Sequence, residues 1–299
     1  MTDRDLEIFM CVAKYGKMSD AAKQLYISQS SVSQAIASIE REYNILLFER
    51  LSKSLYLTEQ GKKLLSHARI LFSVKNDLND FLTGAPHRHL LKVGATVTVA
   101  TCVLSPIITG VRKQLSDVKI NVNVANSFIL EEMIMKNEVN LAMIENKVSN
   151  PNIICIDMMD DELVMVCGRG HQFFGREQVT AEELASVELI LRKTGNETRT
   201  LFEKQMSELQ LPLNVSWSCD NSEPIRSAVV NNQGVSVISK RLVADEVKRG
   251  ILWTCPVSGL NLKRQFSVIY HKNKYITDEM TAFIRSCQNV ARKESQFDL

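Results

Sequence analysis

Residues 28–43, SQSSVSQAIASIEREY, decide the fold of the first part of the chain. At about 3.6 residues per helical turn, the larger apolar side chains of this stretch fall in one narrow arc, and small or polar side chains fall in the opposite arc. The pattern therefore predicts an amphipathic helix that packs on a core through a single face. We expect the inward face to hold Val32, Ala35, Ile36, Ile39 and Tyr43, and the outward face to hold Gln29, Ser30, Ser33, Gln34, Ala37 and Arg41.

Short helical patterns precede this helix, and a hairpin pattern follows it. Each short helix is expected to bury a small apolar face and to be bounded by a residue typical of helix ends. Residues 51–57 are too few for a helix and contain polar turn residues, so they predict the hairpin of a small wing. Together these elements make residues 1–57 a winged helix-turn-helix. The first helix is expected to bury Leu6, Phe9, Met10 and Ala13 and to end at Gly16, and the second to begin with Ser19 as its cap and to bury Ala21, Ala22 and Leu25.

The outward face of the central helix has the chemistry of a surface that reads DNA. Amide and hydroxyl groups can bond to base edges in the major groove, and the face carries no carboxylate that phosphates would repel. An ordinary solvated helix face is the alternative, although such faces are usually richer in Lys and Glu. Basic side chains of the wing would lie near phosphates, but each could also be an ordinary exposed base. The expected DNA contacts are Gln29, Ser30, Ser33, Gln34, Arg50 and Lys53.

Residues 21–65, AAKQLYISQSSVSQAIASIEREYNILLFERLSKSLYLTEQGKKLL, resemble the amino-terminal signature of LysR-type transcriptional regulators. The alanine pair before the turn, the SQSSVS start of the recognition helix, LFER before the wing and LTEQG after it all occur at the spacing of that family. Tyr43 and Asn44 depart from the family, which commonly has Leu-Gly there. Asn44 tolerates the left-handed conformation of a helix C-cap, so we expect the turn to form. The resemblance implies a sequence-specific, DNA-binding regulator.

A long helical pattern follows the wing, and Thr58 is its expected N-cap. Its apolar side chains recur at alternating three- and four-residue spacings, which is typical of a short coiled-coil seam. We expect no part of the head to cover this seam, so pairing with a second copy of the chain is its simplest use. The resemblance likewise implies that residues 58–88 are the linker helix and hinge of a homodimer or tetramer, and residues 83–89 should break the helix. The seam consists of Leu64, Ala68, Leu71, Leu78 and Leu82, interrupted by Lys75.

From residue 90 onward, strand-like and helical patterns alternate, which indicates α/β subdomains with strands covered by helices. Examples of the strand patterns are LKVGAT (91–96), KINVNVA (119–125) and DELVMVC (161–167). We therefore expect an α/β protein with an all-α N-terminal part. The resemblance to the LysR-type effector domain, which shares its architecture with periplasmic solute-binding proteins, implies that residues 89–299 form two subdomains. It also implies that one comprises about 89–161 plus 264–299, and the other 162–263.

Polar residues follow several of the predicted strands at the points where helices begin. In open α/β sheets, ligands bind beyond the carboxyl ends of the strands, where helix N-termini offer free amides. The sequence therefore predicts a cleft site for a small anionic effector, and Arg192 and Arg199 could add charge there. Capping of their own helices is the alternative role for the polar side chains. The expected effector contacts are Thr96, Thr98, Asn126, Ser127, Gly195, Asn196 and Thr198.

Other functional classes lack their motifs in this chain. The sequence has no Walker-type phosphate loop, no GxSxG elbow and no HExxH pattern, so we expect no enzyme, no cofactor and no metal site. It has no basic-apolar secretory start and no long apolar run, which favours a cytoplasmic protein without a membrane partner. A solute-binding protein and a cysteine-based redox-sensing regulator remain as alternatives. The seven cysteines are scattered and include no CxxC pair, which favours reduced, buried thiols.

Overall fold

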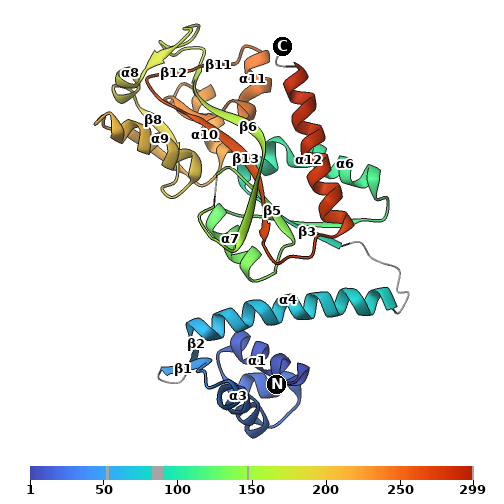
Figure 1. The fold of residues 1–299 in the computed structure, drawn as a ribbon. Helices are drawn as coiled ribbons and strands as arrows, with labels where there is room; N and C mark the ends of the chain where they lie inside the picture. Colours follow the sequence, from blue (N-terminus) through green and yellow to red (C-terminus); the bar gives the residue numbers. More distant parts are fainter. Residues whose placement is uncertain (52–53, 83–89, 147, 298–299) are drawn as a thin grey trace. The chain divides into compact units, whose positions relative to one another are not determined.

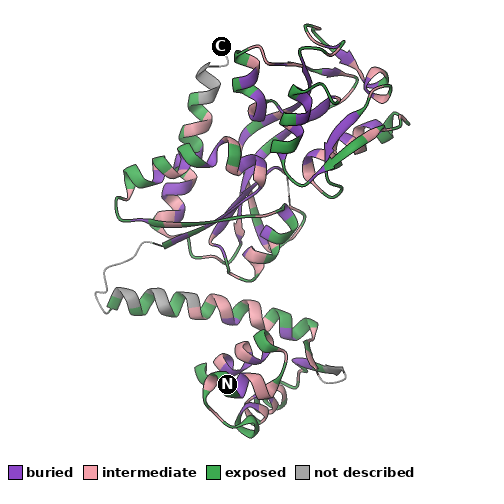
Figure 2. Ribbon diagram, turned by 180° about the vertical axis from the view of Figure 1, so that it is seen from behind, coloured by how far each residue is buried: buried purple, intermediate pink, exposed green. Residues whose placement is uncertain are grey.

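The computed structural model describes residues 1–51, 54–82, 90–146 and 148–297, and the chain divides into two compact units (Figure 1). The first unit is built on Met1–His87, and the second takes nearly all of the chain from Arg88 onward. Each unit buries apolar side chains of its own, and Figure 2 shows the buried strands of the second unit in purple. Among the described residues, no helix is both long enough and apolar enough to cross a membrane.

The first unit is a winged helix-turn-helix that ends in a long helix. Its elements are α1 (Asp3–Tyr15), α2 (Met18–Leu25), α3 (Gln29–Tyr43), β1 (Phe48–Leu51), β2 (Ser54–Leu57) and α4 (Glu59–Leu82). Helix α3 packs against α1 and α2 and buries Val32, Ile36 and Ile39, as its helical pattern predicts. Strands β1 and β2 pair in an antiparallel hairpin and form the wing. The Oγ1 atom of Thr58 accepts a hydrogen bond from Gly61 N at 2.9 Å, so Thr58 is the N-cap of α4.

Two details of the head differ from the sequence predictions. Tyr43, expected to face the core, is 50% exposed. It lies in the last turn of α3, beyond Ile39, which is the last residue of this helix in the head core. The prediction of Ser19 as an N-cap is also wrong, because α2 already begins at Met18 and no side chain caps it. Asn44 does adopt the expected left-handed conformation, with φ 51°.

The apolar seam of α4 is packed at its first turns and exposed at its later turns. Leu64 packs against the head core, and Ala68 is buried. By contrast, Leu71, Leu78 and Leu82 are exposed in the described chain. The expectation that the head leaves the whole seam uncovered is therefore wrong for the first turns of α4, and it holds for the later turns.

The second unit is built on strands and helices that alternate along the chain. Its strands are β3 (Leu90–Ala95), β4 (Lys119–Val124), β5 (Leu141–Ile144), β6 (Ile153–Gly168), β7 (Val179–Thr180), β8 (Leu189–Arg192), β9 (Val215–Cys219), β10 (Ser236–Ser239), β11 (Leu252–Cys255), β12 (Val257–Ser258) and β13 (Lys263–His271). Its helices are α5 (Val97–Cys102), α6 (Leu104–Gln114), α7 (Ser127–Met135), α8 (Ala181–Ala185), α9 (Glu197–Glu208), α10 (Ser222–Val230), η1 (Lys240–Val243), α11 (Ala244–Lys248) and α12 (Asp278–Phe297). The predicted fold class, α/β after an all-α beginning, is confirmed.

Strand pairing determines which strands have neighbouring carboxyl ends, and thus which of the polar residues that follow the strands lie close together. The main sheet has the order β10-β6-β13-β5-β3-β4, and β11 also pairs with β6. Within it, β3 pairs in parallel with both β4 and β5, whereas β6 and β13 run antiparallel. A separate pair, β8 and β9, is parallel. The carboxyl ends of β3, β4 and β5 therefore lie at one edge, and those of β8 and β9 lie at another.

Strand β6 contributes to two apolar cores of the second unit. It begins at Ile153, well before the predicted segment at 161, because β13 pairs with it along this whole stretch. Met159, before the crossing point, belongs to one apolar core, which α6 and α12 cover, and Leu163, after it, belongs to another. At the crossing, Asp161 of β6 lies opposite Arg264 of β13. These two cores are thus joined by paired strands, and the predicted division into two subdomains stays a prediction.

Gly61, in the first turn of α4, fits a space that leaves no room for a side chain. A Cβ at this position would lie 2.2 Å from Leu47 O and 2.9 Å from Leu57 Cδ2. We predict that Gly61→Ala destabilises the head by roughly 1–3 kcal/mol, because the added methyl forces α4 away from the hairpin. Thermal unfolding of the full-length chain, followed by circular dichroism, measures the effect. Lys63→Ala, at an exposed position two residues on, should barely change the melting temperature, and equal stability of the two variants would contradict the packing argument.

Candidate functional site

The outward face of α3 is open to solvent. Gln29, Ser30 and Gln34 are exposed, and Ser33 is half-buried. Ser28 caps the helix, and its Oγ lies 2.7 Å from Ser30 Oγ, so the Ser30 hydroxyl is engaged in the cap. Within the described residues, no hydrogen bond holds the side chains of Gln29, Ser33 or Gln34. These three side chains can therefore bond to a molecule from solution.

The predicted basic contacts of the wing are only partly described. The backbone of Arg50 lies on β1 opposite Leu55 of β2, whereas Lys53 lies outside the described residues. Both contacts stay predictions. Sequence reasoning did not single out Tyr26, which ends α2 in the left-handed conformation and is 95% exposed in the turn before α3.

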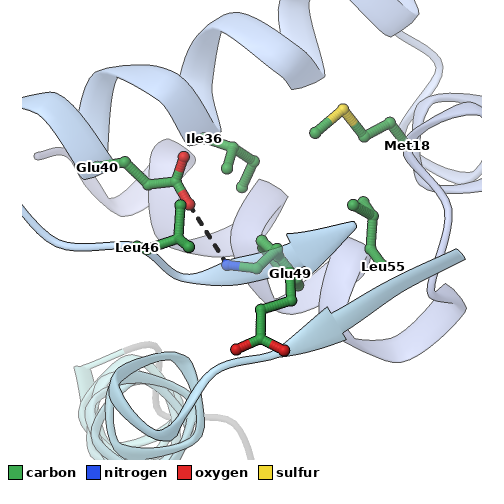
Figure 3. Close-up of a pocket in the computed structure, with 7 residues that line it drawn as sticks. Met18, Ile36, Glu40, Leu46, Glu49 and Leu55 are labelled. Carbon is green, nitrogen blue, oxygen red and sulfur yellow. Dashed lines mark hydrogen bonds between the residues drawn. The ribbon is translucent and has the colours of Figure 1, made fainter. Parts of the chain in front are cut away.

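A hollow of about 560 Å³ opens in the head, and none of the predicted DNA contacts is among its lining residues (Figure 3). Oε1 of Glu40 accepts hydrogen bonds from Leu47 N at 2.7 Å and Phe48 N at 3.3 Å, so this carboxylate holds the segment between α3 and β1. Because the lining combines apolar side chains with two carboxylates, it suits neither phosphate nor a small anion. The lining residues are Met18, Ile36, Glu40, Leu46, Phe48, Glu49 and Leu55.

In the second unit, parallel strands bring polar residues to one edge of the main sheet. Thr96 follows β3, and its backbone N donates to Met143 O of β5 at 3.1 Å. On the other side of β3, Ala125 N donates to Ala95 O at 3.1 Å, which places the residues after β4 beside the end of β3. Glu145 follows β5 directly. The residues after β3, β4 and β5 therefore share one carboxyl edge.

Several predicted effector contacts at this edge are buried hydroxyls. Thr96, Thr98 and Ser127 are buried, and their hydroxyl oxygens have no hydrogen-bond partner among the residues described. Buried hydroxyls are nearly always bonded to protein or water, so these three need an explanation. Asn126 is exposed, and its Oδ1 accepts from Ile129 N at 2.9 Å, which is the capping role weighed as the alternative.

The edge formed by β8 and β9 carries the remaining predicted contacts. Arg192 ends β8 and is 5% exposed. Its Nη2 donates to Asp220 O at 2.8 Å, and its Nε has no partner in the described chain. Gly195 has a left-handed backbone with φ 84°. Oδ1 of Asn196 accepts from Thr198 N at 3.1 Å, so Asn196 also caps its own helix.

Two hydrogen bonds join the β8–β9 edge to the main sheet within the second unit. Nη1 of Arg264 donates to Thr198 Oγ1 at 3.0 Å. Nδ2 of Asn146, just after β5, donates to Glu197 Oε2 at the start of α9. Arg264 also donates from Nε to Asp161 Oδ2 at 2.7 Å, and its Nη2 has no partner among the described residues. The strand ends of both edges therefore belong to one polar neighbourhood.

Most of the charged residues in this polar neighbourhood were not predicted from the sequence. Glu145 and Arg264 are buried there, and their only sequence signal is a charge at the end of, or within, an apolar strand. Burial lowers the pKa of Arg192, the negative charge of Glu145 opposes that shift, and the positive charge of Arg264 adds to it. Arg199, considered as a further charge, instead pairs with Glu203 at 2.6 Å.

A second hollow, of about 210 Å³, adjoins this neighbourhood through Asn146 and Arg264. None of the predicted effector contacts lines it. In the part of the chain that the structure describes, no group of three or more His, Cys, Asp or Glu could hold a metal ion. The residues around this hollow are Asn146, Leu201, Lys263, Arg264, Gln265 and Ser267.

The cysteines give little support to a redox sensor. All seven are free thiols. Burial raises the pKa of Cys102, Cys167 and Cys287 to about 12, and it raises the pKa of Cys219 as well. Because the thiolate is the reactive form, these four thiols are poorly suited to oxidation at neutral pH.

Comparison with known proteins gives family matches over both units. Residues 4–62 match the family described as "Bacterial regulatory helix-turn-helix protein, lysR family". Residues 84–292 match the family described as "LysR substrate binding domain". These matches agree with the resemblance seen in the sequence, and a solute-binding protein would not account for the first of them.

Individual proteins are similar over most of the chain. The chain is 26% identical to the HTH-type transcriptional activator CmpR of Synechocystis sp., over 95% of this chain and 93% of CmpR. The structure of a full-length OxyR variant from Pseudomonas aeruginosa is similar with a TM-score of 0.73 at 19% identity, over 98% of this chain and 97% of that one. The Synechocystis CcmR regulatory domain in complex with 2-PG has a TM-score of 0.63 at 18% identity, over 68% of this chain and 97% of that one. The two structural likenesses show the fold.

Proposed function

The chain belongs to the LysR family of bacterial transcriptional regulators, and on this basis we propose that α3 reads a specific DNA sequence under the control of a small anionic effector bound in the second unit. The observation that carries the proposal is the exposed face of α3, where Gln29, Ser33 and Gln34 have no partner in the described chain. We place the protein in the cytoplasm, where its DNA would be.

The side chains of α3 support base reading more than backbone binding. A glutamine amide can bond to adenine through two atoms, and serine hydroxyls can donate or accept at several bases. Contacts to phosphate, by contrast, fix the position of the protein on DNA without reading its sequence. We assign base reading to Gln29, Ser33 and Gln34, and backbone contact to Arg50 and Lys53.

Buried donors without partners support an anion site in the second unit. The hydroxyls of Thr96, Thr98 and Ser127, with Nε of Arg192 and Nη2 of Arg264, are buried and unbonded within the described residues. Each such group costs about 1–3 kcal/mol when it is left unsatisfied. An anion could accept from several of these groups at once. The solved complex of the CcmR regulatory domain with 2-PG supports a small-molecule role for a domain of this fold.

Control of DNA binding would arise from contacts to both edges of the site. A ligand that touches both favours one arrangement of the two subdomains by its differential affinity for that arrangement, and a ligand without such a difference shifts nothing. The hydrogen bonds Thr198–Arg264 and Asn146–Glu197 already join the β8–β9 edge to the main sheet. We propose that effector binding changes the balance of these contacts and thereby the DNA affinity of the heads.

We further propose that α4 pairs with the same helix of a second copy. Leu71, Val74, Leu78 and Leu82 are 49%, 47%, 52% and 69% exposed along its later turns. Large exposed apolar side chains gathered on one helix mark a partner surface. A pair of chains would also present two α3 helices, which suits two DNA half-sites.

We predict that Gln34→Ala lowers affinity for the operator by roughly 1–3 kcal/mol and hardly changes affinity for random DNA, because the lost amide reads a base edge. Fluorescence anisotropy with both DNAs and the full-length protein measures the two affinities. Gln24→Ala replaces an exposed glutamine on α2 and should keep the ratio of specific to random binding. An equal loss on both DNAs in Gln34→Ala would show that α3 does not read sequence through this residue.

Leu71→Glu should dissociate the dimer, because a carboxylate buried against its symmetry mate costs roughly 3–5 kcal/mol when it is uncompensated. Sedimentation velocity at micromolar concentration should show monomers. Leu209→Glu is the matched control, since Leu209 is similarly exposed, at 43%, but ends α9 instead of lying on α4. If Leu71→Glu stays dimeric, the contact between chains lies elsewhere.

A further inference from the structure

Glu145 occupies a position that its own chain does not explain. It follows β5 at the carboxyl edge shared with β3 and β4, and it is 2% exposed. No hydrogen bond or ion pair joins its carboxylate to any residue in the described parts of the chain. A buried carboxylate is normally paired or accepts several hydrogen bonds, because its charge is costly to remove from water.

The neighbouring cations do not neutralise Glu145 by contact. Nε of Arg264 is committed to Asp161 Oδ2 at 2.7 Å, and Asp161 also accepts from Ser239 Oγ at 2.6 Å. Arg192 donates to a backbone carbonyl at 2.8 Å and makes no ion pair within the described residues. Burial lowers the pKa of Arg192, and the negative charge of Glu145 opposes this shift with a smaller effect. Glu145 and Arg192 are therefore electrostatic neighbours that do not touch.

We propose that the effector is bifunctional: beside its anionic group it carries a hydroxyl or ammonium donor, which Glu145 accepts. The inference rests on the proposed effector site. The anionic group accepts from the unbonded N–H groups of Arg192 and Arg264 and from the hydroxyl of Thr98. The donor reaches the carboxylate of Glu145, at the carboxyl edge shared by β3, β4 and β5. Small hydroxy acids and amino acids have this pair of groups.

Simple oxyanions fit the site less well for two physical reasons. A ligand without a donor leaves the Glu145 carboxylate without a partner among the described residues, and its own charge repels that carboxylate at short range. A hydroxyl or ammonium group instead forms a hydrogen bond with a charged partner, which is stronger than one between neutral groups. Glu145 thus selects against anions that lack a donor as much as it attracts those that have one.

Matched acids that differ only in the donor test this inference. Propanoate, L-lactate and L-alanine share one carboxylate, and succinate, L-malate and L-aspartate share two. Isothermal titration calorimetry with the full-length protein should show donor-bearing members of each set binding about tenfold or more tightly than the donor-free member. Glu145→Gln keeps an acceptor oxygen but removes the charge, so it should erase most of the ammonium advantage and less of the hydroxyl advantage.

Glu162→Gln is the matched control, because Glu162 lies on β6 with its Oε2 3.8 Å from Lys240 Nζ, and it should keep the wild-type ratios. Succinate binding to the wild type as tightly as malate and aspartate would overturn the inference and leave an anionic effector in place. Wild-type ratios in Glu145→Gln would overturn it in the same way. Binding of the diamine putrescine, with no binding of any of the six acids, would instead overturn the proposed anion site.

Discussion

The second unit depends on a buried ion pair at the point where β6 and β13 cross between its two apolar cores. The side chain of Asp161 is fully buried, and its oxygens accept from Arg264 Nε at 2.7 Å and Ser239 Oγ at 2.6 Å. Loss of one partner would leave an unpaired buried charge at a cost of about 3–5 kcal/mol. Arg264 also reaches Thr198 at 3.0 Å, so the residue that fixes the crossing aligns one edge of the proposed effector site.

Polar side chains without partners in the described chain are exposed on α3 of the first unit and buried in the second unit. The separate functions that we propose for the two units follow from this difference. On α3, amides such as Gln34 are exposed and unbonded. The hydrogen bonds to water that such an amide would lose on binding DNA can be replaced by hydrogen bonds to base edges. In the second unit, hydroxyls such as Thr98 are buried and unbonded within the described residues, so the folded chain carries a cost that a ligand can relieve. Recognition of DNA is thus separated in the chain from recognition of the effector.

Local patterns predicted the parts of this structure that local physics determines. The burial of Ile36 could be predicted because helical periodicity can be counted along the chain. The exposure of Tyr43 could not, because the point where a core ends depends on other elements. The rule that ligands bind beyond the carboxyl ends of strands pointed to Thr98 from the sequence alone, and the Thr98 hydroxyl is indeed buried without a partner among the described residues. It could not tell that Asn126 caps its own helix, since that depends on side-chain geometry. Glu145 was missed because an acid after a strand looks like a solvated loop residue until the tertiary fold buries it.

Whether occupancy of the second unit sets DNA affinity can be measured by fluorescence anisotropy of a labelled operator with the full-length protein, titrated with the tightest-binding of the six acids. Operator affinity of the wild type should change about fivefold or more at saturation, as expected for coupling between two sites. Thr98→Val should remove the response and keep the fold, because the Thr98 hydroxyl has no partner among the described residues. An unchanged wild-type affinity, or an equal response in Thr98→Val, would contradict control through this site.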